Sequence, residues 1–332
     1  MDIKNKFPKD TRFLVTGGAG FIGSNLCELL IEAGYHTRCM DNLSTGKLEN
    51  IQHLMACNNF EFINEDITNV SSCESAAEGV DYIFHQAAWG SIPRSIRMPV
   101  EYGENNIQGT LNMLEAAKKN QVKKFVYASS SSVYGDSQTL PKKEGEEGEV
   151  ISPYALTKKV NELHGKLYSD IYDLPTVGLR YFNVFGRRQN PNGQYAAVIP
   201  KFIELMQQND PLKIYGDGKQ SRDFTYIDNV LQANIKAALS SDKTNGKAYN
   251  IACGEVINLN NLVAIMSKIF NKEAQVNYTE KRKGDIVNSY ASIEKSVEAL
   301  NYSPTIKLEE GLAETIKWYM SQSVEILSAG SK

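Results

Sequence analysis

The strongest constraint on the fold comes from a short apolar run that leads straight into a glycine-rich turn. Phe13–Thr16 is followed by Gly17-Gly18-Ala19-Gly20-Phe21-Ile22-Gly23, and the amphipathic pattern of a helix extends over Phe21–Ala33. Glycines let the backbone turn sharply and approach a pyrophosphate, which then rests on the amides at the positive end of the helix. The segment therefore predicts a strand, turn and helix that bind a dinucleotide, although a tight turn alone would use the same glycines.

The next β-forming run, Thr37–Asp41, ends in an acidic residue that bears on the choice of dinucleotide. Asp41 lies 18 residues beyond Gly23, where a carboxylate can accept hydrogen bonds from the adenosine ribose hydroxyls. A carboxylate at this position would repel a 2′-phosphate, so the sequence favours NAD over NADP. The alternative is that the aspartate is incidental to the turn.

Short β-forming runs alternate with stretches of helical length from Phe13 to Gly135, which predicts a parallel sheet with crossover helices. We expect an α/β protein, a Rossmann-type doubly wound parallel sheet with a smaller C-terminal α/β substrate-binding lobe. The first domain would span residues 1–181 and the second lobe mainly 182–332, with segments near 226–253 returning to the first domain. Further strands are expected at Phe60–Asn64, Tyr82–Gln86, Lys124–Ser129 and Thr176–Tyr181, and further helices at Val100–Asn120 and Pro153–Ile171.

Length and composition exclude several classes of protein. A chain of 332 residues fits two lobes that share a cleft, because single cores usually stop growing near ~250–300 residues. The net charge of −3 gives no field to hold nucleic acid. No apolar run approaches the ~20 residues of a membrane span, and the N-terminus lacks the apolar core of a signal peptide, so a soluble, cytoplasmic protein is expected.

Cysteines and charges give no sign of a further site. The five cysteines form no CxxC pair and have no nearby histidine at metal-ligand spacing, which argues against a metal site and against a disulfide framework. Cys27 and Cys39 lie in apolar patterns and are interpreted as small core residues. The only charge run, Lys142–Glu149, is interpreted as a solvated loop.

Two residues with catalytic potential, Tyr154 and Lys158, lie four positions apart on a predicted helix and so share one of its faces. An unperturbed tyrosine has a pKa near ~10, but a neighbouring ammonium and a cationic nicotinamide ring both favour the phenolate, which makes a general base plausible. The spacing alone is common by chance. It gains weight because Ser129–Ser132 stands at the carboxyl end of the preceding strand, where parallel sheets bind ligands, although these serines could serve the turn alone.

Several further motifs follow one another along nearly the whole chain. They are His85–Ala88, Asn105–Thr110, Ser130 with Val133-Tyr134-Gly135, Tyr154–Lys158, Leu179–Asn183, Ser221–Phe224 and Arg282–Asp285. Together with the glycine turn, they resemble the extended short-chain dehydrogenase/reductases that act on nucleotide sugars. Within that family, the run Tyr195–Pro200 and Ser289 look most like UDP-N-acetylhexosamine 4-epimerases. The resemblance implies an NAD-dependent isomerase that interconverts UDP-GlcNAc and UDP-GalNAc through a transient 4-keto sugar.

The resemblance assigns roles position by position. It makes Tyr154 the base, Lys158 its electrostatic partner and a ligand of the nicotinamide ribose, and Ser130 the hydroxyl that orients the sugar 4-OH. It implies NAD contacts for Gly17, Gly20, Phe21, Ile22, Gly23, Asp41, Asn42, Ser44, Thr45, Gly46, Asp66, Ile67, Gln86, Ala87, Ala88, Asn105, Tyr154, Lys158 and Tyr181. It implies UDP-sugar contacts for Gly90, Ser91, Arg94, Ser130, Ser131, Tyr154, Asn183, Ala197, Val198, Arg222, Arg282, Asp285 and Ser289.

Three of these positions, Arg222, Arg282 and Ser289, bear on the substrate. Arginines suit a diphosphate because a guanidinium offers several donors in a fixed fork, although the alternative for Arg222 and Arg282 is a surface ion pair. Epimerases restricted to UDP-glucose and UDP-galactose resemble one another in having tyrosine at the position of Ser289. A serine leaves room for an acetamido group, unless the residue belongs to a surface loop. The family also implies a homodimer built from the helices near Val100–Asn120 and Pro153–Ile171.

The residues that follow the predicted strand Lys124–Ser129 distinguish between the reactions found in the family. Family members that dehydrate or decarboxylate their sugar carry carboxylates there, whereas this chain has Ser131 and Ser132. Without a second acid or base the 4-keto sugar can only be reduced again, so epimerisation is expected. One alternative is a 4-epimerase or decarboxylase of a UDP-uronic acid such as UDP-GlcNAcA, with Arg94 and Arg97 reading the C6 carboxylate. The other is a non-catalytic NAD-binding sensor.

Overall fold

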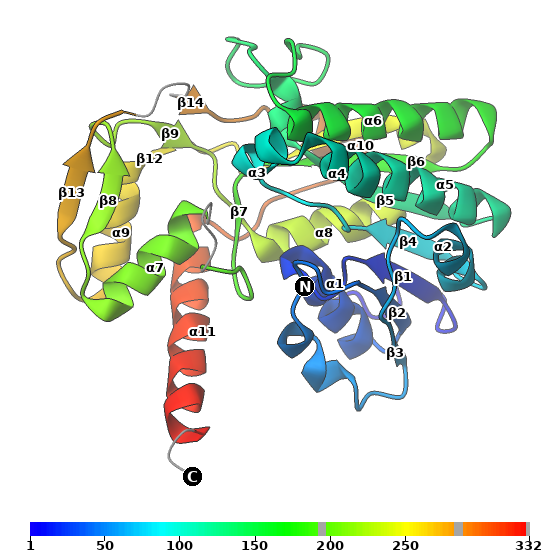
Figure 1. The fold of residues 1–332 in the computed structure, drawn as a ribbon, viewed down its shortest axis with the longest axis horizontal. Coiled ribbons are helices and arrows are strands. Elements are labelled where there is room, and N and C mark those ends of the chain that lie inside the picture. The colour runs from blue at the N-terminus through cyan, green and yellow to red at the C-terminus, as the bar shows by residue number, and fades with distance from the viewer. Residues whose placement is uncertain (192–196, 282–287, 330–332) are drawn as a thin grey trace.

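The computed structural model describes residues 1–191, 197–281 and 288–329, and its centre is a seven-stranded sheet in the order β11-β6-β5-β4-β1-β2-β3 (Figure 1). Every neighbouring pair in this sheet is parallel. This confirms the expected Rossmann-type α/β fold, with each predicted strand end within one residue of the observed one. The strands are β1 (Arg12–Thr16), β2 (His36–Met40), β3 (Phe60–Ile63), β4 (Tyr82–His85), β5 (Lys124–Ser130), β6 (Thr176–Tyr181) and β11 (Lys247–Ile251).

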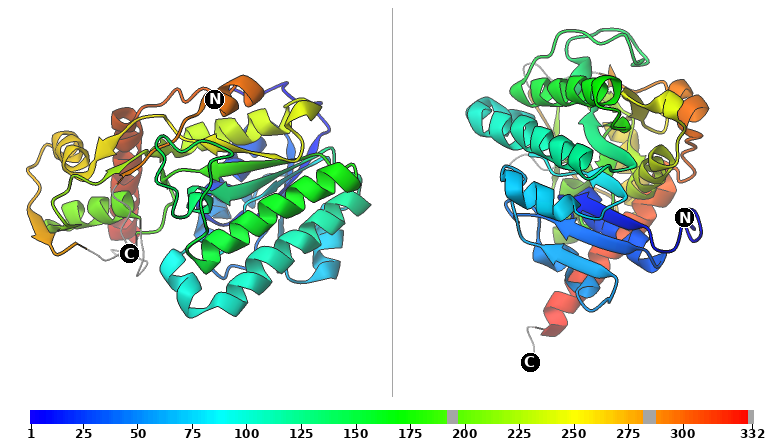
Figure 2. Two further views of the ribbon diagram at one scale, coloured as in Figure 1. Left: turned by 90° about the horizontal axis from the view of Figure 1, so that it is seen from above. Right: turned by 90° about the vertical axis from the view of Figure 1, so that its right-hand side faces the viewer.

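Helices cover both faces of the sheet (Figure 2). One face carries α1 (Phe21–Glu32) and α8 (Ile227–Ala238), and the other carries α2 (Val70–Ala77), α5 (Gly109–Lys119) and α6 (Pro153–Ile171). Successive side chains of a strand point to opposite faces, so Phe13 and Val15 of β1 join one apolar core and Leu14 joins the other. Burial on both faces requires the uninterrupted apolar run that β1 shows. Cys27 and Cys39 are fully buried in the first of these cores.

The helix expected over Val100–Asn120 is interrupted. The chain forms α3 (Ile92–Arg97) and α4 (Pro99–Tyr102), then a π-helical segment (Gly103–Gln108) that continues directly into α5. A π-helical turn widens the helix locally and is frequent at functional sites. This one carries Asn105 and Asn106 on the way to the sheet edge. The sequence pattern did not predict α2, α3 or the π-helical segment.

A smaller lobe lies beside the sheet (Figure 1). Its short sheets have the orders β12-β9-β14, β13-β8 and β10-β7. Within residues 226–253, β11 forms an edge of the large sheet beside β6, and α8 packs against β5 and β6. The other elements are β7 (Val184–Phe185), α7 (Val198–Gln208), β8 (Leu212–Tyr215), β9 (Ser221–Arg222), β10 (Thr225–Tyr226), β12 (Ile257–Asn258), α9 (Leu259–Phe270), β13 (Val276–Thr279), β14 (Asn288–Ser289), α10 (Glu294–Leu300) and α11 (Leu308–Ala329).

The last helix, α11, projects away from the body of the molecule (Figure 1). Short 3₁₀ turns occur at Leu48–Asn50, Gln52–Leu54, Ser131–Tyr134 and Asp242–Thr244. Across the described ranges, no helix is both long enough and apolar enough to cross a bilayer.

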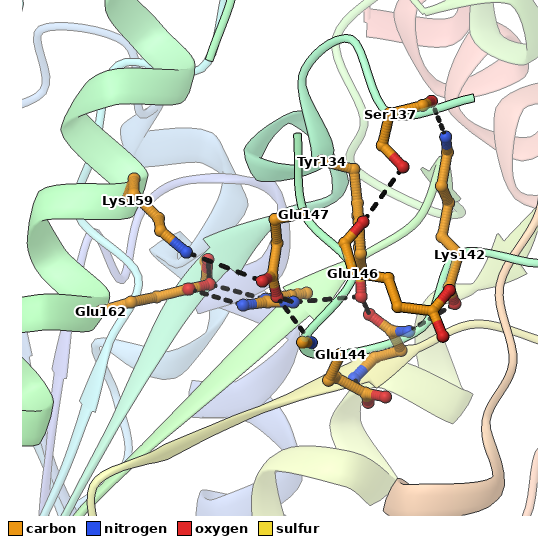
Figure 3. Close-up of polar contacts among 12 residues, drawn as sticks. Tyr134, Ser137, Lys142, Glu144, Glu146, Glu147, Lys159 and Glu162 are labelled. Atoms are coloured by element: carbon orange, nitrogen blue, oxygen red, sulfur yellow. Dashed lines mark hydrogen bonds and ion pairs between the residues drawn. The ribbon is translucent and has the colours of Figure 1, made fainter. Parts of the chain in front are cut away.

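The charge run Lys142–Glu149 is only in part a solvated loop, which corrects the interpretation from the sequence. Lys143, Glu146 and Glu149 are exposed, whereas Glu144 and Glu147 turn towards the sheet (Figure 3). Glu147 forms an ion pair with Arg180 of β6, and Oε1 of Glu144 accepts a hydrogen bond of 2.8 Å from the Asn250 amide of β11. Lys142 is buried and donates its ammonium to the Ser137 carbonyl. Lys142, Glu144 and Glu147 are therefore partnered by the sheet or by the loop itself.

The same loop also contacts the segment after β14. The Lys142 amide donates a 2.9 Å hydrogen bond to the Tyr290 carbonyl, and the Lys142 carbonyl accepts a 3.0 Å hydrogen bond from the Ser292 amide. Nδ2 of Asn250 donates to the Lys142 carbonyl (3.0 Å) and to the Ser292 carbonyl (3.1 Å). One loop of the large domain is thus bonded both to the sheet and to a segment from the last part of the chain.

Arg180 is the centre of a buried ion-pair cluster beneath this loop. Its Nε and Nη2 donate to the two carboxylate oxygens of Glu162, each at 2.8 Å, and Nη1 donates to the Tyr134 hydroxyl at 3.0 Å. The side chains of Arg180 and Glu162 are only 5% and 9% exposed. Oε1 of Glu162 also accepts a 2.6 Å hydrogen bond from Ser129, at the end of β5. The cluster therefore joins β5, β6 and α6 just behind the sheet edge.

This cluster gives a test of the fold. Glu162→Gln should lower the free energy of unfolding by about 3 kcal/mol, because removing one partner leaves a buried charge poorly compensated. The matched control is Asp170→Asn, which breaks the exposed i,i+4 pair with Lys166 and should change the stability by roughly 0.5 kcal/mol or less. Urea unfolding followed by circular dichroism measures both. Equal losses in the two variants would contradict a special role for the buried pair.

Candidate active site

A cavity of about 580 Å³ opens at the carboxyl ends of the central strands. Because all strands of the large sheet run parallel, the loops that leave them meet at this one edge. The cavity brings together residues that lie far apart in the sequence and were expected to contact NAD. These are Gly17, Gly20, Phe21, Ile22, Gly23, Asp41, Asn42, Ser44, Thr45, Ile67, Gln86, Ala87, Ala88, Asn105, Tyr154, Lys158 and Tyr181.

The glycine turn has no space for side chains at two positions. Gly17 has φ of +65°, and a Cβ atom there would lie 2.7 Å from the Ala87 backbone. A Cβ on Gly23 would lie 2.1 Å from the Gly17 carbonyl oxygen. The first α-helical hydrogen bond of α1 runs from the Ser24 amide to the Gly20 carbonyl, so the preceding amides stand at the open end of the helix. This close packing beside a helix N-terminus suits a pyrophosphate.

Asp41 is fixed between two loops of the cavity wall. Its carboxylate, in a residue only 8% exposed, accepts hydrogen bonds from the Ala19 amide (2.9 Å) and the Leu43 amide (2.8 Å). Burial raises the pKa of this carboxyl, and the two hydrogen bonds oppose the rise. A Cβ on Gly46 would lie 2.8 Å from both carboxylate oxygens, so the chain packs directly against them. These features fit a dinucleotide whose ribose hydroxyls bind Asp41.

Two predicted cofactor residues are not part of the cavity lining. Gly46 packs against the Asp41 carboxylate, as described above. Asp66 accepts a 2.6 Å hydrogen bond from Nδ2 of Asn42, and a second carboxylate oxygen accepts from the amide and hydroxyl of Thr68. Although burial alone would raise the pKa of Asp66, these hydrogen bonds hold it below the ordinary value. In this structure both residues support other residues of the wall.

Tyr154 and Lys158 lie one helical turn apart near the start of α6. Ser152 caps this helix by accepting the Ala155 amide at 3.1 Å, and the Tyr154 amide donates to Oγ of Ser95 at 3.1 Å. Ser130, at the end of β5, is near enough to the Tyr154 side chain to lower the pKa of the tyrosine. The sequence expectation that Ser130, Tyr154 and Lys158 come together at the sheet edge therefore agrees with the geometry.

The electrostatics differ from the expectation that Lys158 already favours the Tyr154 phenolate. Burial raises the pKa of Tyr154, and Ser130 only partly offsets the rise. Burial lowers the pKa of Lys158 to about 8, against a small opposing effect of Glu162. Nζ of Lys158 donates to the Ala128 carbonyl oxygen at 2.7 Å. The ammonium is thus held by the backbone of β5. Burial is the largest effect on the pKa of Tyr154.

A histidine behind the cavity fixes the wall and does not titrate in the physiological range. His85 is buried, which lowers its pKa to about 3. The Thr110 hydroxyl donates to the Asn106 carbonyl at 2.7 Å, so it accepts from Nε2 of His85 at 3.0 Å. Nδ1 of His85 then accepts from the Thr16 hydroxyl at 2.7 Å. The neutral ring thereby joins the end of β1, the end of β4 and α5.

Sequence reasoning missed several residues that line the cavity. Ser129 was placed at a strand end that binds ligands but was not assigned to the cofactor, and Trp89 lies three residues after the predicted strand Tyr82–Gln86, so the strand-end rule could have found both. Other lining residues come from segments that only the tertiary structure brings here, with the Tyr319 hydroxyl of α11 donating to the Gln189 carbonyl. The missed set is Met40, Lys47, Asn50, Glu65, Trp89, Ala128, Ser129, Arg188, Gln189, Asn190, Pro191, Trp318 and Tyr319.

Among the predicted sugar-site residues, Gly90 and Tyr154 line the cavity. Ser131 begins a 3₁₀ turn after Ser130, and Ala197 precedes α7, which begins at Val198. The Ser91 hydroxyl caps α3 by accepting the Arg94 amide at 3.2 Å. The guanidinium of Arg94 stacks on the Trp89 ring, 3.9 Å from its centroid. Arg282 and Asp285 lie outside the described residues.

Three other predicted substrate residues meet around Asp223. Nδ2 of Asn183 donates to the Asp223 carbonyl at 2.9 Å, and the Asp223 amide donates to the Ser289 carbonyl at 3.0 Å. Ser289 pairs with Arg222 across β14 and β9. Ser289 is half-buried in the two-residue strand β14, whose other residue, Asn288, is exposed.

The fold and this arrangement define the class. A dinucleotide cavity lined by Tyr154 and Lys158, with Ser130 at the end of the neighbouring strand β5, on a doubly wound parallel sheet is the architecture of the short-chain dehydrogenase/reductases. Residues 13–252 match the NAD dependent epimerase/dehydratase family, so the chain belongs to that family and NAD is its cofactor.

Similar proteins extend over almost the whole chain. A putative UDP-glucose 4-epimerase of Methanocaldococcus jannaschii is 38% identical, over 92% of this chain and 97% of its own length. The structure of UDP-N-acetylglucosamine 4-epimerase from Methanobrevibacter ruminantium M1, in complex with UDP-N-acetylmuramic acid, is 41% identical with a TM-score of 0.90, covering 95% of this chain and all of that one. UDP-glucuronic acid 4-epimerase from Bacillus cereus, in complex with UDP-glucuronic acid and NAD, is 34% identical with a TM-score of 0.86, covering 94% and 100%.

Proposed function

We propose that this chain is a UDP-N-acetylhexosamine 4-epimerase that interconverts UDP-GlcNAc and UDP-GalNAc. The observation that carries the proposal is that Tyr154 and Lys158, one helical turn apart on α6, both line the dinucleotide cavity. Ser130 ends the neighbouring strand β5, and we assign its hydroxyl to the same sugar hydroxyl as Tyr154. The neighbouring positions hold Ser131 and Ser132, which cannot serve as a second acid or base. The names of the similar UDP-sugar 4-epimerases support the same reaction class.

In the proposed reaction, Ser130 orients the 4-OH of the sugar and Tyr154 removes its proton. NAD, when bound, accepts the C4 hydride and returns it. Tyr154 then gives the proton back to the oxygen at C4 after the 4-keto sugar has turned its other face to the cofactor. Because the raised pKa of Tyr154 disfavours the phenolate in this structure, positive charge near the hydroxyl must favour it during turnover. Lys158, one turn away, contributes part of that charge and binds the nicotinamide ribose.

The UDP half is assigned to the smaller lobe. Asn183, Arg222 and Ser289 meet around Asp223, and Ala197 with Val198 begins α7 nearby in the chain. Arg222 offers donors in the planar fork that suits a diphosphate. Arg282 and Asp285, which lie outside the described residues, are assigned to the same half by resemblance. All five cysteines are free thiols, which fits the reducing cytoplasm that we propose as the location.

A second candidate substrate is a UDP-sugar that carries a carboxylate, as in a UDP-uronic acid 4-epimerase. The observation that favours it is Arg94, whose guanidinium carbon lies 3.9 Å from the centroid of the Trp89 ring that lines the cavity. The Bacillus cereus relative was solved with UDP-glucuronic acid, a substrate of this kind.

The proposed reaction is tested with a panel of UDP-sugars followed by NMR. Wild-type protein should convert UDP-GlcNAc and UDP-GalNAc into each other. Tyr154→Phe should lower turnover by ~10²–10⁴-fold, because the phenylalanine ring cannot transfer a proton. Bound NAD should remain in the variant, measured after denaturation. Faster conversion of UDP-GlcNAcA than of UDP-GlcNAc would favour a UDP-uronic acid as the substrate. A wild type that converts none of the sugars would favour the alternative of a non-catalytic NAD-binding sensor. Near-normal turnover by Tyr154→Phe would refute the role of the base.

Ser289 gives a test of the sugar preference. Turning the sugar over sweeps its C2 substituent through a large volume, and close-packed sites resist added atoms at a cost of ~1–3 kcal/mol. Ser289→Tyr should therefore lose roughly tenfold or more of the activity on UDP-GlcNAc and keep activity on UDP-glucose. Ser289→Ala, which preserves the space, serves as the control and should keep UDP-GlcNAc activity. Equal declines on both sugars in the tyrosine variant would disprove a gate at this position.

We further propose that the chain forms a homodimer through α6 and the helices near Val100–Asn120. On α6, Leu163, Leu167 and Ile171 follow at steps of four residues and are 53%, 48% and 61% exposed. Such a stripe favours burial against another helix. Val100 on α4 is exposed as well.

The dimer is tested by introducing a charge into the stripe. Leu163→Glu should shift the sedimentation coefficient of the wild-type dimer to that of a monomer, because an unpaired carboxylate is costly inside an apolar interface. Leu239→Glu alters an exposed leucine at the end of α8 and should leave the assembly unchanged. A monomeric wild type would exclude the proposal.

A further inference from the structure

Trp89 makes a contact that the proposed reaction does not use. It follows β4 and lines the dinucleotide cavity, and its indole Nε1 donates a 3.4 Å hydrogen bond to Oγ of Ser44 in the loop after β2. In the sheet, β1 lies between β4 and β2 (Figure 1), so a contact between their two loops has to cross the carboxyl end of β1. The glycine turn begins there at Gly17. The Trp89–Ser44 contact therefore spans the place that suits the pyrophosphate.

One end of this contact is firmly held. The amide and carbonyl of Trp89 both bind the side chain of Asn106, at 2.8 and 3.1 Å. The Arg94 guanidinium stacks on the indole at 3.9 Å, and the Tyr102 ring meets its edge with centroids 5.6 Å apart. These partners come from the π-helical segment, α3 and α4. The indole thus has a fixed backbone and two fixed neighbours.

The other end is weakly held. A distance of 3.4 Å lies beyond the ordinary range of about 2.7–3.2 Å for an N–H···O hydrogen bond. Ser44 lies in an exposed loop, and its amide is held only by the adjacent Asn42 side chain within the described part of the chain. The contact can therefore open at Ser44 while Trp89 stays anchored to Asn106.

We propose that Trp89 is a strap across the dinucleotide site that retains NAD between turnovers. The purpose rests on the proposed function: an epimerase regenerates its oxidised cofactor in every cycle, so it gains nothing from releasing the cofactor and loses the reaction if the reduced form escapes. The large indole covers the middle of the dinucleotide, and NAD leaves only when the contact with Ser44 opens. The cover that the indole ring provides retains NAD, because the hydrogen bond to Ser44 is too long to contribute much.

The strap is tested by the rate at which NAD leaves the full-length protein. Protein loaded with NAD is diluted, passed through rapid gel filtration at set times, and the NAD that remains is quantified. Trp89→Ala should release NAD about tenfold faster or more, because differences in affinity between related complexes appear mostly in dissociation rates. Trp89→Phe keeps an aromatic cover and should stay within about threefold of wild type. The matched control Tyr278→Ala removes an exposed ring of β13 and should behave as wild type.

The NAD release rates test the strap independently of the epimerase activity. Unchanged release from Trp89→Ala overturns it, as does equally fast release from Tyr278→Ala or immediate release from the wild type. A wild type that epimerises sugars while Trp89→Ala retains NAD normally would refute the strap alone. A wild type that acts on no sugar but shows the expected order of release would refute only the epimerase.

A second measurement covers the case in which Trp89→Ala does not fold. The chain has two tryptophans, so in Trp318→Phe all tryptophan emission comes from Trp89. Adding NAD to this variant after its bound cofactor has been removed should quench the emission, because the indole would contact the dinucleotide. Unchanged emission upon saturation with NAD would overturn the proposal.

Discussion

Parallel pairing in the central sheet is the constraint on which the rest of the molecule depends. It buries both faces of β1, β4 and β5, which demands apolar side chains on both sides, and it brings the polar ends of these strands to one edge. The cavity exists because the loops at that edge approach each other closely. Gly17 and Gly23 permit this approach, since a single added carbon at either position would overlap backbone atoms. Cofactor binding and strand packing are therefore consequences of one arrangement.

Burial governs the charges at the carboxyl edge of the sheet, where the proposed proton transfer takes place. Lys158 and Tyr154 are both desolvated, which shifts their pKa values towards the neutral forms, and the Lys158 ammonium is held by a backbone carbonyl. Behind them, the Arg180–Glu162 pair is fully compensated, and His85 is neutral. In the proposed reaction, Lys158 therefore supplies only part of the positive charge that favours the Tyr154 phenolate, and the rest comes with the bound cofactor.

The sequence predicted what depends on local pattern. The strand ends, the glycine turn, Asp41 and the Tyr154–Lys158 turn were found because burial on two faces, a tight turn and helical spacing leave direct marks in the order of residues. Partners supplied by distant segments leave no such mark. Lys142–Glu149 reads as a solvated run because its partners, Arg180 and Asn250, come from two later strands. Ser91 was expected to bind sugar, and its hydroxyl caps a helix that the pattern did not predict.

The bonds between the loop at Lys142 and the segment after β14 have a consequence for exchanging parts between relatives. The chain order suggests residue 181 as the point at which to exchange the smaller lobe between related proteins, because most of that lobe follows it. Yet Tyr290 and Ser292 would then face a host loop that had not evolved with them, and so would Asn250 of the sheet edge. A chimera that transfers the segment after β14 should therefore carry residues 137–149 with it, because a chimera that leaves them behind breaks the hydrogen bonds of Lys142 with Tyr290 and Ser292.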